Sequence, residues 1–261
     1  MNNNETMLPR NNINNDRLHK IRPVISNLIL QFKKLPYAER LSLDEQMCAT
    51  KAKNYLKQFM PAKPHKWGYK LFLITDTNGF TYNFEIYTGQ ENDHTKRLDT
   101  ETNLGSCANT VVRLVRDVPR HLNHKIYHDN YYTTTLLAVT LAKQGIQTVE
   151  TVRRDRVPNL KLPTLTQMKN QPRGTSVEYV ANIDETDVST VVWKDNKIVS
   201  LLSTFCNINP TEIVTRYDKK NKSVLNIFCP SIVKEYNKHM GGVDLMDSHI
   251  GRYKIKIKSR K

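Results

Sequence analysis

The chain has 261 residues, which is enough to bury a sizeable core in one or two domains. Its 40 Lys and Arg against 25 Asp and Glu give a formal charge of +15 at pH 7, which favours a polyanionic partner, with nucleic acid as the first candidate. No run of 18 apolar residues occurs and the N-terminal stretch is polar and rich in Asn, so we expect no membrane span, no secretory signal and an intracellular location.

The four cysteines are far apart in the sequence and form no C-x-x-C pair, so we expect reduced thiols and no zinc site: Cys48, Cys107, Cys206 and Cys229. Helical spacing of apolar residues predicts a helix from residue 15 or 16 to about 34, which Pro23 would weaken or kink. The stretch LSLDEQM at 41–47 then alternates as a strand does, which places Asp44 on the face opposite Leu43.

A lysine-rich stretch with interleaved aromatic residues and no acid follows, at 48–75. Cations for phosphate and flat rings for base stacking suit nucleic acid, although a solvated loop beside core aromatic residues explains the pattern equally well. Residues 69–75 and 80–87 read as a hairpin around Asp-Thr-Asn-Gly, so Asp76 is interpreted as a turn residue. A helix over 106–116 is expected to present apolar side chains to a core.

A βαβ unit is predicted next, with a strand at 125–128, a helix from Thr133 that ends before Gly145, and a strand at 146–152. Asp129 follows the first of these strands. Ligands of βαβ sheets gather outside the carboxyl ends of the strands, so Asp129 is a candidate functional residue. The alternative is that Asp129 and its Asn neighbour only make a turn.

The region after this unit is rich in Pro and basic residues and then gives several short strand signals, which predicts a β-rich insertion: 177–180, 188–193, 198–203 and 213–217. At its start, Arg153, Arg154 and Arg156 are placed to meet a DNA phosphate, with an ordinary basic loop as the alternative.

A last helix is predicted from Pro230 toward HMGGVDLMD. Asp244 and Asp247 are three residues apart and share one helix face, with Val243 and Met246 packed behind them. Two like charges on one face are unfavourable unless a cation lies between them.

The candidate acidic set therefore comprises Asp44, Asp129, Asp244 and Asp247. Carboxylates without His or Cys select Mg²⁺ or Mn²⁺ over zinc. Two such ions activate an attacking water and stabilise the leaving oxygen of a phosphodiester. A chain with 25 acidic residues offers many such sets, so spacing alone leaves metal catalysis open.

Five segments together resemble the piggyBac family of transposases and their domesticated relatives: LSLDEQM, FMPAKPHKWGYKLFLITDTNGFTYNFEIYTG, HDNYYTTTLLAVTLAKQGIQTVETVRRDR, VVWKDNKIVSLLST and YNKHMGGVDLMD. The resemblance runs in order over residues 16–258. It implies an α/β fold, namely an RNase H-like mixed sheet with flanking helices, interrupted by a β-rich insertion domain. The implied divisions are an N-terminal tail and helix (1–38), a first core part (39–153), the insertion (154–228) and a second core part (229–261).

The same resemblance implies that Asp44, Asp129, Asp244 and Asp247 are the catalytic residues and the ligands of Mg²⁺ or Mn²⁺. In the implied reaction, water attacks a phosphodiester at the element end. The freed 3′-hydroxyl then attacks the other strand to form a hairpin, which is reopened and joined to a TTAA target.

The implied partner is DNA, in the nucleus, with a homodimer or a full-length homologue as further partners and no small-molecule substrate. The expected DNA contacts are basic: Lys51, Lys53, Lys63, Lys66, Arg153, Arg154 and Arg156. The chain departs from the family pattern at 50–53, and it stops at Lys261, before the further helices and the cysteine-rich domain of the family. We therefore expect a C-terminally truncated core, with a catalytically inactive DNA-binding or protein-interaction module as the alternative.

Overall fold

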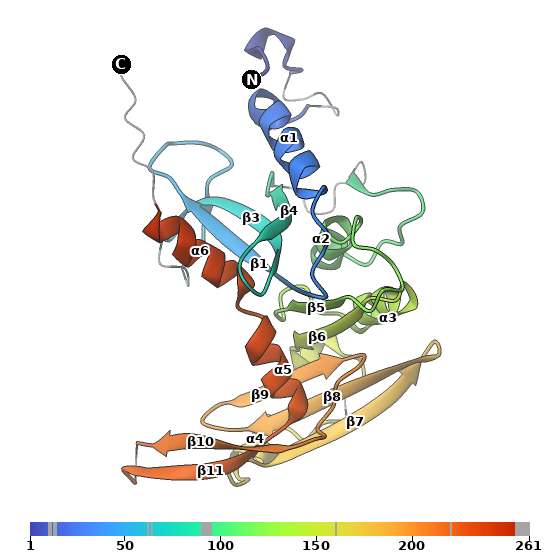
Figure 1. Cartoon of the computed structure of the whole chain (residues 1–261), viewed down its shortest axis with the longest axis vertical. Helices are drawn as coiled ribbons and strands as arrows, with labels where there is room; N and C mark the ends of the chain where they lie inside the picture. The colour runs from blue at the N-terminus through green and yellow to red at the C-terminus, as the bar shows by residue number, and fades with distance from the viewer. Residues whose placement is uncertain are drawn as a thin grey trace. The chain divides into compact units, whose positions relative to one another are not determined.

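The computed structural model describes all residues except 10, 11, 13, 14, 62, 64, 90–95, 160, 220 and 254–261. The chain divides into two compact units, whose helices and strands are labelled in Figure 1. Unit 1 comprises Met1–Ala38, Asp44–Asp117 and Gly242–Lys261, and unit 2 comprises Glu39–Leu43 and Val118–Gly241. Among the described residues, no helix is both long enough and apolar enough to cross a membrane.

The strands of unit 1 are organised around β3 (Trp67–Asp76), which pairs antiparallel with β4 (Thr81–Ile86) and, near its start, with β2 (Gln58–Phe59). The predicted hairpin is confirmed. Asp76 Oδ1 accepts hydrogen bonds from the backbone N–H groups of Asn78 and Phe80 at 2.9 and 2.8 Å, as a turn residue does. The part of β1 (Arg40–Ala49) that belongs to unit 1 lies beside β3.

The N-terminal helix is shorter than predicted. A 3₁₀ turn at Asn4–Thr6 and another at His19–Ile21 precede α1, which spans Arg22–Phe32. Pro23 therefore lies in the first turn of α1, where its missing N–H is not needed, and the expected kink is not there. Asp16 holds the start of the helix, because its carboxylate binds the Arg22 guanidinium at 2.7 Å.

Among the described residues of unit 1 are two further helices. The predicted helix over 106–116 is present as α2 (Ser106–Leu114), whose buried Arg113 pairs with Glu85 of β4 at 2.6 Å. The helix α6 (Gly242–Arg252) packs Val243 and Met246 against Leu73 of β3, which confirms the predicted packing behind its aspartates.

Unit 2 contains the predicted βαβ unit, which is confirmed. The strands β5 (Lys125–His128) and β6 (Gln147–Thr151) are parallel, and α3 (Thr135–Lys143) connects them. The first part of β1 also pairs parallel with β5, with Leu43 opposite His128. The N-cap lies one residue later than predicted, because Thr134, not Thr133, caps the helix by accepting a hydrogen bond from the Leu137 N–H.

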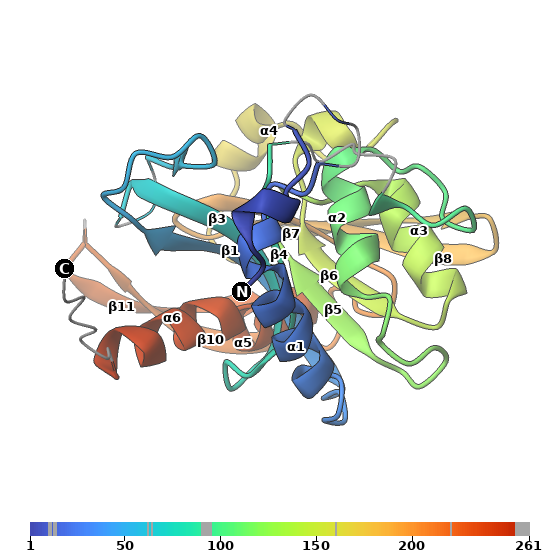
Figure 2. The ribbon, with the colours of Figure 1, turned by 90° about the horizontal axis from the view of Figure 1, so that it is seen from above.

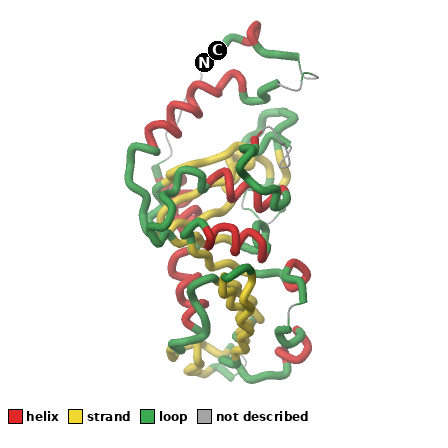
Figure 3. The backbone as a smooth tube through the Cα atoms, turned by 90° about the vertical axis from the view of Figure 1, so that its right-hand side faces the viewer, coloured by secondary structure: helices red, strands yellow, loops and turns green. Residues whose placement is uncertain are grey.

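The β-rich region of unit 2 follows the 3₁₀ turn Arg154–Arg156 and the short helix α4 (Leu165–Lys169) (Figure 3). Its described residues form the strands β7 (Ser176–Ile183), β8 (Thr186–Lys194), β9 (Ile198–Ser203), β10 (Glu212–Asp218) and β11 (Ser223–Cys229). The strands β7 to β9 form an antiparallel meander, and β9 pairs antiparallel with β6. The strands β10 and β11 form a separate ribbon, and β11 was not predicted from the sequence. The predicted domain limits stay a prediction.

The last predicted helix is two helices, α5 (Ser231–His239) and α6, because the helix stops at Met240 and restarts at Gly242. Pro230 precedes α5 as its N-cap residue. In unit 2, α3 and α5 lie on opposite sides of β5 and β6 (Figure 2). Ile232 and Val233 of α5 pack with Val149 and Leu201, so the α/β character follows from a mixed sheet covered by helices.

Candidate functional site

Asp44 lies in the middle of β1, between the buried residues Leu43 and Glu45. Its Oδ1 accepts a hydrogen bond from the backbone N–H of Glu45 at 2.7 Å. Burial raises the pKa of Asp44 to about 7, the neighbouring Glu45 carboxyl acts in the same direction, and the charge of Lys63 opposes both. The Lys63 Nζ donates a hydrogen bond to the Glu45 carbonyl oxygen at 2.8 Å, so this predicted DNA contact also lies beside Asp44 in unit 1.

The two aspartates of α6 differ in exposure. Asp244 is exposed in the first turn of the helix, and Asp247 is half-buried. The Gln46 Nε2 of β1 donates a hydrogen bond to Asp247 Oδ1 at 2.6 Å. The strand that carries Asp44 is therefore tied directly to the helix that carries Asp244 and Asp247. Sequence reasoning missed Gln46, which no motif singled out.

Asp129 belongs to unit 2 and is half-buried where β5 ends. Its Oδ1 accepts a hydrogen bond from the Tyr131 N–H at 2.8 Å, and its carbonyl oxygen accepts one from Thr133 Oγ1 at 3.0 Å. Asp129 thus takes part in the turn that it begins, as the turn interpretation expected. The Thr133 hydroxyl also lies 2.8 Å from the Thr151 carbonyl oxygen, which links this turn to β6.

Arg156 supports the same turn, because its Nη1 donates to the carbonyl oxygens of Asn130 and Tyr131 at 2.8 and 2.5 Å. Arg154 donates to the carbonyl oxygens of Leu162 and Pro163, and the exposed Arg153 pairs with Asp155 at 2.7 Å. These arginines, predicted as DNA contacts, therefore have intramolecular partners within unit 2. Their contact with DNA stays a prediction.

The predicted lysine contacts lie in unit 1. Lys51, Lys53 and Lys66 are exposed, and Lys63 is half-buried. Exposed aromatic residues accompany them, since the Phe59 and Trp67 rings lie 4.8 Å apart by centroid. Cations and flat rings thus occupy one part of unit 1, as the pattern predicted.

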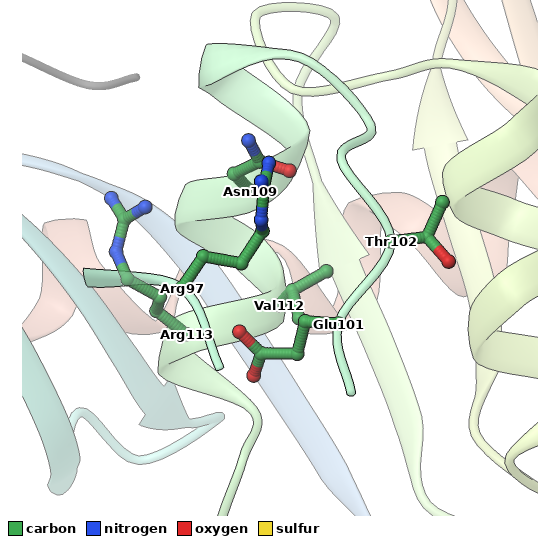
Figure 4. Close-up of a pocket in the computed structure, with 6 residues that line it drawn as sticks. All are labelled: Arg97, Glu101, Thr102, Asn109, Val112 and Arg113. Carbon is green, nitrogen blue, oxygen red and sulfur yellow. The ribbon is translucent and has the colours of Figure 1, made fainter. Parts of the chain in front are cut away.

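Unit 1 also has a pocket on α2 and the loop before it, lined by Arg97, Glu101, Thr102, Asn109, Val112 and Arg113 (Figure 4). Two of its charged groups are paired with neighbouring side chains, since Arg113 binds Glu85 and Glu101 binds Arg116. Glu101 binds Arg116 at 2.6 Å, and this ion pair and hydrogen bond lower the pKa of the Glu101 carboxyl. The pocket contains none of the candidate aspartates, so it does not form part of the acidic site.

Carboxylates are the ligands that Mg²⁺ and Mn²⁺ prefer, and the half-buried Asp44 with its raised pKa has the character of a group that a cation would neutralise. In chemistry the four aspartates fit such an ion. Within the described part of the chain, no three His, Cys, Asp or Glu side chains are already grouped as a metal site.

Comparison with known proteins identifies the class. The chain belongs to the transposase family described as Transposase IS4, whose family model matches residues 2–261. Within this class its relatives are piggyBac-derived proteins. It is 30% identical over 250 residues to human PiggyBac transposable element-derived protein 3, and 31% identical over 250 residues to human PiggyBac transposable element-derived protein 2. Each match covers 94% of this chain and 41% of the relative.

A solved structure, the piggyBac transposase in a synaptic complex with hairpin DNA, matches with a TM-score of 0.63 and 25% identity. The match covers 88% of this chain and 44% of that chain, so the chain spans less than half the length of these relatives. The family resemblance and the α/β fold class predicted from the motifs are confirmed. The chain contains a piggyBac-like transposase domain.

Proposed function

We propose that this domain cleaves and joins DNA phosphodiesters with Mg²⁺ or Mn²⁺, and that Asp44, Asp129, Asp244 and Asp247 hold the metal. The observation that carries the proposal is the hydrogen bond from Gln46 to Asp247, which links the strand of Asp44 to the helix of the other two unit 1 aspartates. The solved relative was captured with hairpin DNA, which supports DNA as the substrate.

The bound metal would activate the attacking hydroxyl and stabilise the leaving oxygen. The protein's own part is to hold the carboxylates and to bind the substrate backbone. Gln46 orients Asp247, the Glu45 N–H orients Asp44, and the turn at Tyr131 orients Asp129. No separate general base is included in this scheme, because a metal held by these carboxylates would lower the pKa of the attacking water.

The direct test is the nicking of a labelled duplex that carries a piggyBac-type end flanked by TTAA, in Mg²⁺ or Mn²⁺. We expect metal-dependent cleavage that Asp129→Ala and Asp244→Ala each abolish. The matched control is Asp99→Ala, which removes an exposed carboxylate from unit 1 outside the acidic set and is expected to leave cleavage unchanged. Cleavage that survives Asp129→Ala would contradict the assignment. A scrambled flank in place of TTAA tests the target preference.

Binding to DNA is proposed to use the exposed lysines of unit 1. Because each neutralised phosphate releases counterions, affinity is expected to fall steeply with salt, and Lys51→Gln with Lys53→Gln should flatten that salt dependence. Unchanged salt dependence in this double variant would remove these two lysines from the interface.

The net charge of +15 also favours a second candidate function, a DNA-binding or protein-interaction module without catalysis. Salt-sensitive binding in the absence of any metal-dependent nicking by the wild-type chain would select it. Because the first candidate function acts on DNA, we further propose a nuclear location. We also propose assembly with a second copy or a longer homologue. Microscopy of the tagged chain and light scattering of the DNA complex test these two points.

A further inference from the structure

Two aromatic rings lie side by side on the surface of unit 1. Phe59 of β2 and Trp67 of β3 are opposite each other in the antiparallel register, so both side chains lie on the same face of the sheet. Their ring centroids are 4.8 Å apart, and the ring planes are tilted by 44°. Phe59 is nevertheless 51% exposed and Trp67 is 53% exposed. These two rings are therefore not core residues, which was the alternative interpretation of aromatic residues in the lysine-rich stretch.

The backbone that carries Trp67 is held from behind. Gly68, the next residue, is buried against β1, and a Cβ atom at this position would collide with the Cys48 carbonyl oxygen. The Trp67 carbonyl oxygen also accepts a hydrogen bond from the Thr50 N–H at 3.3 Å. A ring on a backbone that is already ordered loses less conformational freedom when a flat ligand binds to it.

The surroundings of the two rings are cationic. Residues 48–75 contain six lysines and no acid. The Lys57 Nζ lies 5.5 Å from the centroid of the Trp67 ring, within the range of a cation–π contact. Three more lysines of this stretch are exposed: Lys51, Lys53 and Lys66. Within the described part of the chain, none of these four lysines pairs with an acidic side chain, so their charge is available to a phosphate.

Exposed flat rings and unpaired cations together fit a nucleotide whose base is not paired. In a DNA duplex the bases already stack on each other, so an aromatic side chain stacks only on a base that has no partner in the helix. Lysine binds the phosphate of any nucleotide, paired or not. An apolar protein surface would cover the rings but would leave the lysine charges without counterions. The combination therefore favours single-stranded nucleic acid.

We propose that Phe59 and Trp67 form a stacking platform for an unpaired base of single-stranded DNA, and that Lys57 binds the phosphate of the same nucleotide. The choice of DNA rests on the function proposed above, whereas the stacking itself needs neither metal nor cleavage. Stacking depends on the base and not on charge, so the platform adds a preference for unpaired bases to the salt-dependent binding by the exposed lysines.

The test compares two labelled single strands of equal length, oligothymidine and an abasic strand that has the same phosphates but no bases. Since stacking of one base contributes about 10-fold in affinity, the wild-type chain should bind oligothymidine about 10-fold more tightly. Trp67→Ala and Phe59→Ala should each lose most of this preference and keep the affinity for the abasic strand. Tyr179→Ala is the matched control, because it removes an exposed ring of unit 2 beside Glu178 and should change neither affinity.

Tryptophan fluorescence gives a second readout. The chain has two tryptophans, and Trp193 is only 3% exposed, so a change on binding reports on Trp67. We expect oligothymidine to quench the emission and the abasic strand to leave it unchanged. Trp67→Phe keeps a flat ring, and it should bind oligothymidine with most of the wild-type affinity but without quenching. This variant also decides the question if Trp67→Ala does not fold.

Equal affinity of the wild-type chain for the two strands would overturn the proposal, as would an unchanged preference in both alanine variants or quenching that persists in Trp67→Phe. Vesicles that contain anionic lipid, titrated in parallel, test a lipid surface as the occupant. Vesicle binding that Trp67→Ala abolishes, in a chain that shows no preference for bases, would also overturn it. Base-selective binding without metal-dependent nicking would support the platform while the proposed cleavage fails.

Discussion

Gly79, in the turn of the β3–β4 hairpin, lies directly against Met246 of α6: a Cβ atom at position 79 would come within 2.9 Å of the Met246 backbone nitrogen. Gly79 also has φ +85°, a conformation that other residues adopt only with strain. The hairpin turn and the helix that carries Asp244 and Asp247 therefore approach each other at a point where only glycine fits.

Substitution of Gly79 is accordingly expected to loosen α6. Gly79→Ala should lower the free energy of unfolding by about 1–3 kcal/mol, through backbone strain and the close contact. In contrast, Gly251 of the same helix faces open space where a Cβ atom would lie, and Gly251→Ala should raise stability by up to about 1 kcal/mol through helix propensity. Urea unfolding of the two variants checks this difference, and equal effects would show that the Gly79 contact is unimportant.

Removal of the hydrogen bond from Gln46 to Asp247 is expected to lower both the stability of the protein and its affinity for metal. Gln46→Leu removes the donor from a carboxylate and should cost about 1–2 kcal/mol of stability together with weaker Mn²⁺ binding. Gln58→Leu is the control, because the Gln58 amide donates only to nearby carbonyl oxygens at 3.3 Å. Calorimetry with and without Mn²⁺ measures both effects. Normal metal affinity in Gln46→Leu would count against the role of Asp247 as a ligand.

The ionised Asp44 carboxylate is expected to lower stability in the absence of metal and to contribute to Mn²⁺ binding. Its pKa is raised from 3.8 to about 7 by burial, so the folded state holds a proton that the unfolded state has lost between these pH values, and stability falls as pH rises through this window. At pH 8 without metal, Asp44→Asn should therefore be more stable than the wild type. Thermal unfolding should also show that the variant gains less from added Mn²⁺. If Asp44→Asn is less stable than the wild type at pH 8 without metal, the buried Asp44 carboxylate does not destabilise the folded state.

The buried side chains of His128 and Glu150, whose Nε2 and Oε2 atoms lie 3.5 Å apart, predict a different pH profile. For Glu150 the folded pKa of about 8 exceeds the ordinary value of 4.5, so its contribution to stability declines between these values. For His128 the folded pKa of about 4 is below the ordinary value of 6.5, so its contribution rises with pH up to 6.5. The two slopes oppose each other at acidic pH, and only the decline of Glu150 remains above pH 6.5.

Glu150→Gln should remove that decline, so the difference in unfolding free energy between the variant and the wild type should grow from pH 6.5 to pH 8 at up to about 1.4 kcal/mol per unit. Denaturant unfolding at several pH values measures it. A constant difference over this range would mean that Glu150 is already ionised in the folded state.

Substitution of Arg156 is expected to lower stability, whereas substitution of Arg153 is expected to lower only the affinity for DNA. Arg156→Ala should destabilise the turn after Asp129, because it removes the bonds to the Asn130 and Tyr131 carbonyl oxygens. Arg153→Ala affects an exposed ion pair, which contributes little to stability, so its effect should be confined to DNA affinity. Unfolding and DNA titrations of both variants check the contrast, and equal stability would place Arg156 with the DNA contacts instead.

Local patterns predicted the elements that depend on local chemistry. The hairpin around Asp76 and the parallel strands around Asp129 follow from turn residues, alternation and capping, which a sequence displays directly. The strand β11 was missed because its pairing with β10 is what makes it a strand. The break after Met240 was also missed, since the helical pattern continues across a Gly-Gly pair that ends one helix and opens another.

The sequence indicated some residues of the candidate site but not the residues that contact them. The sequence placed the candidate aspartates within a strand, after a strand and on one helix face, and their role as a site stays a prediction. Gln46 acts through a partner 201 residues away and shows no pattern of its own. Glu150 left no signal, because the strand at 147–151 contains four polar residues and the full burial of its acid is evident only in the structure. His128 was counted only as the end of a strand, since the register that brings it to Glu150 emerges on folding.

Unit 1 is assembled from three separate stretches of the chain, and its last stretch, which carries α6, follows the whole of Val118–Gly241. During synthesis the apolar surface of β3 that receives Val243 and Met246 has to wait until that entire segment has left the ribosome. Closing so long a loop slows folding more than it lowers final stability. The side of unit 1 that carries Asp244 and Asp247 is therefore completed late, after the intervening strands have had time to fold.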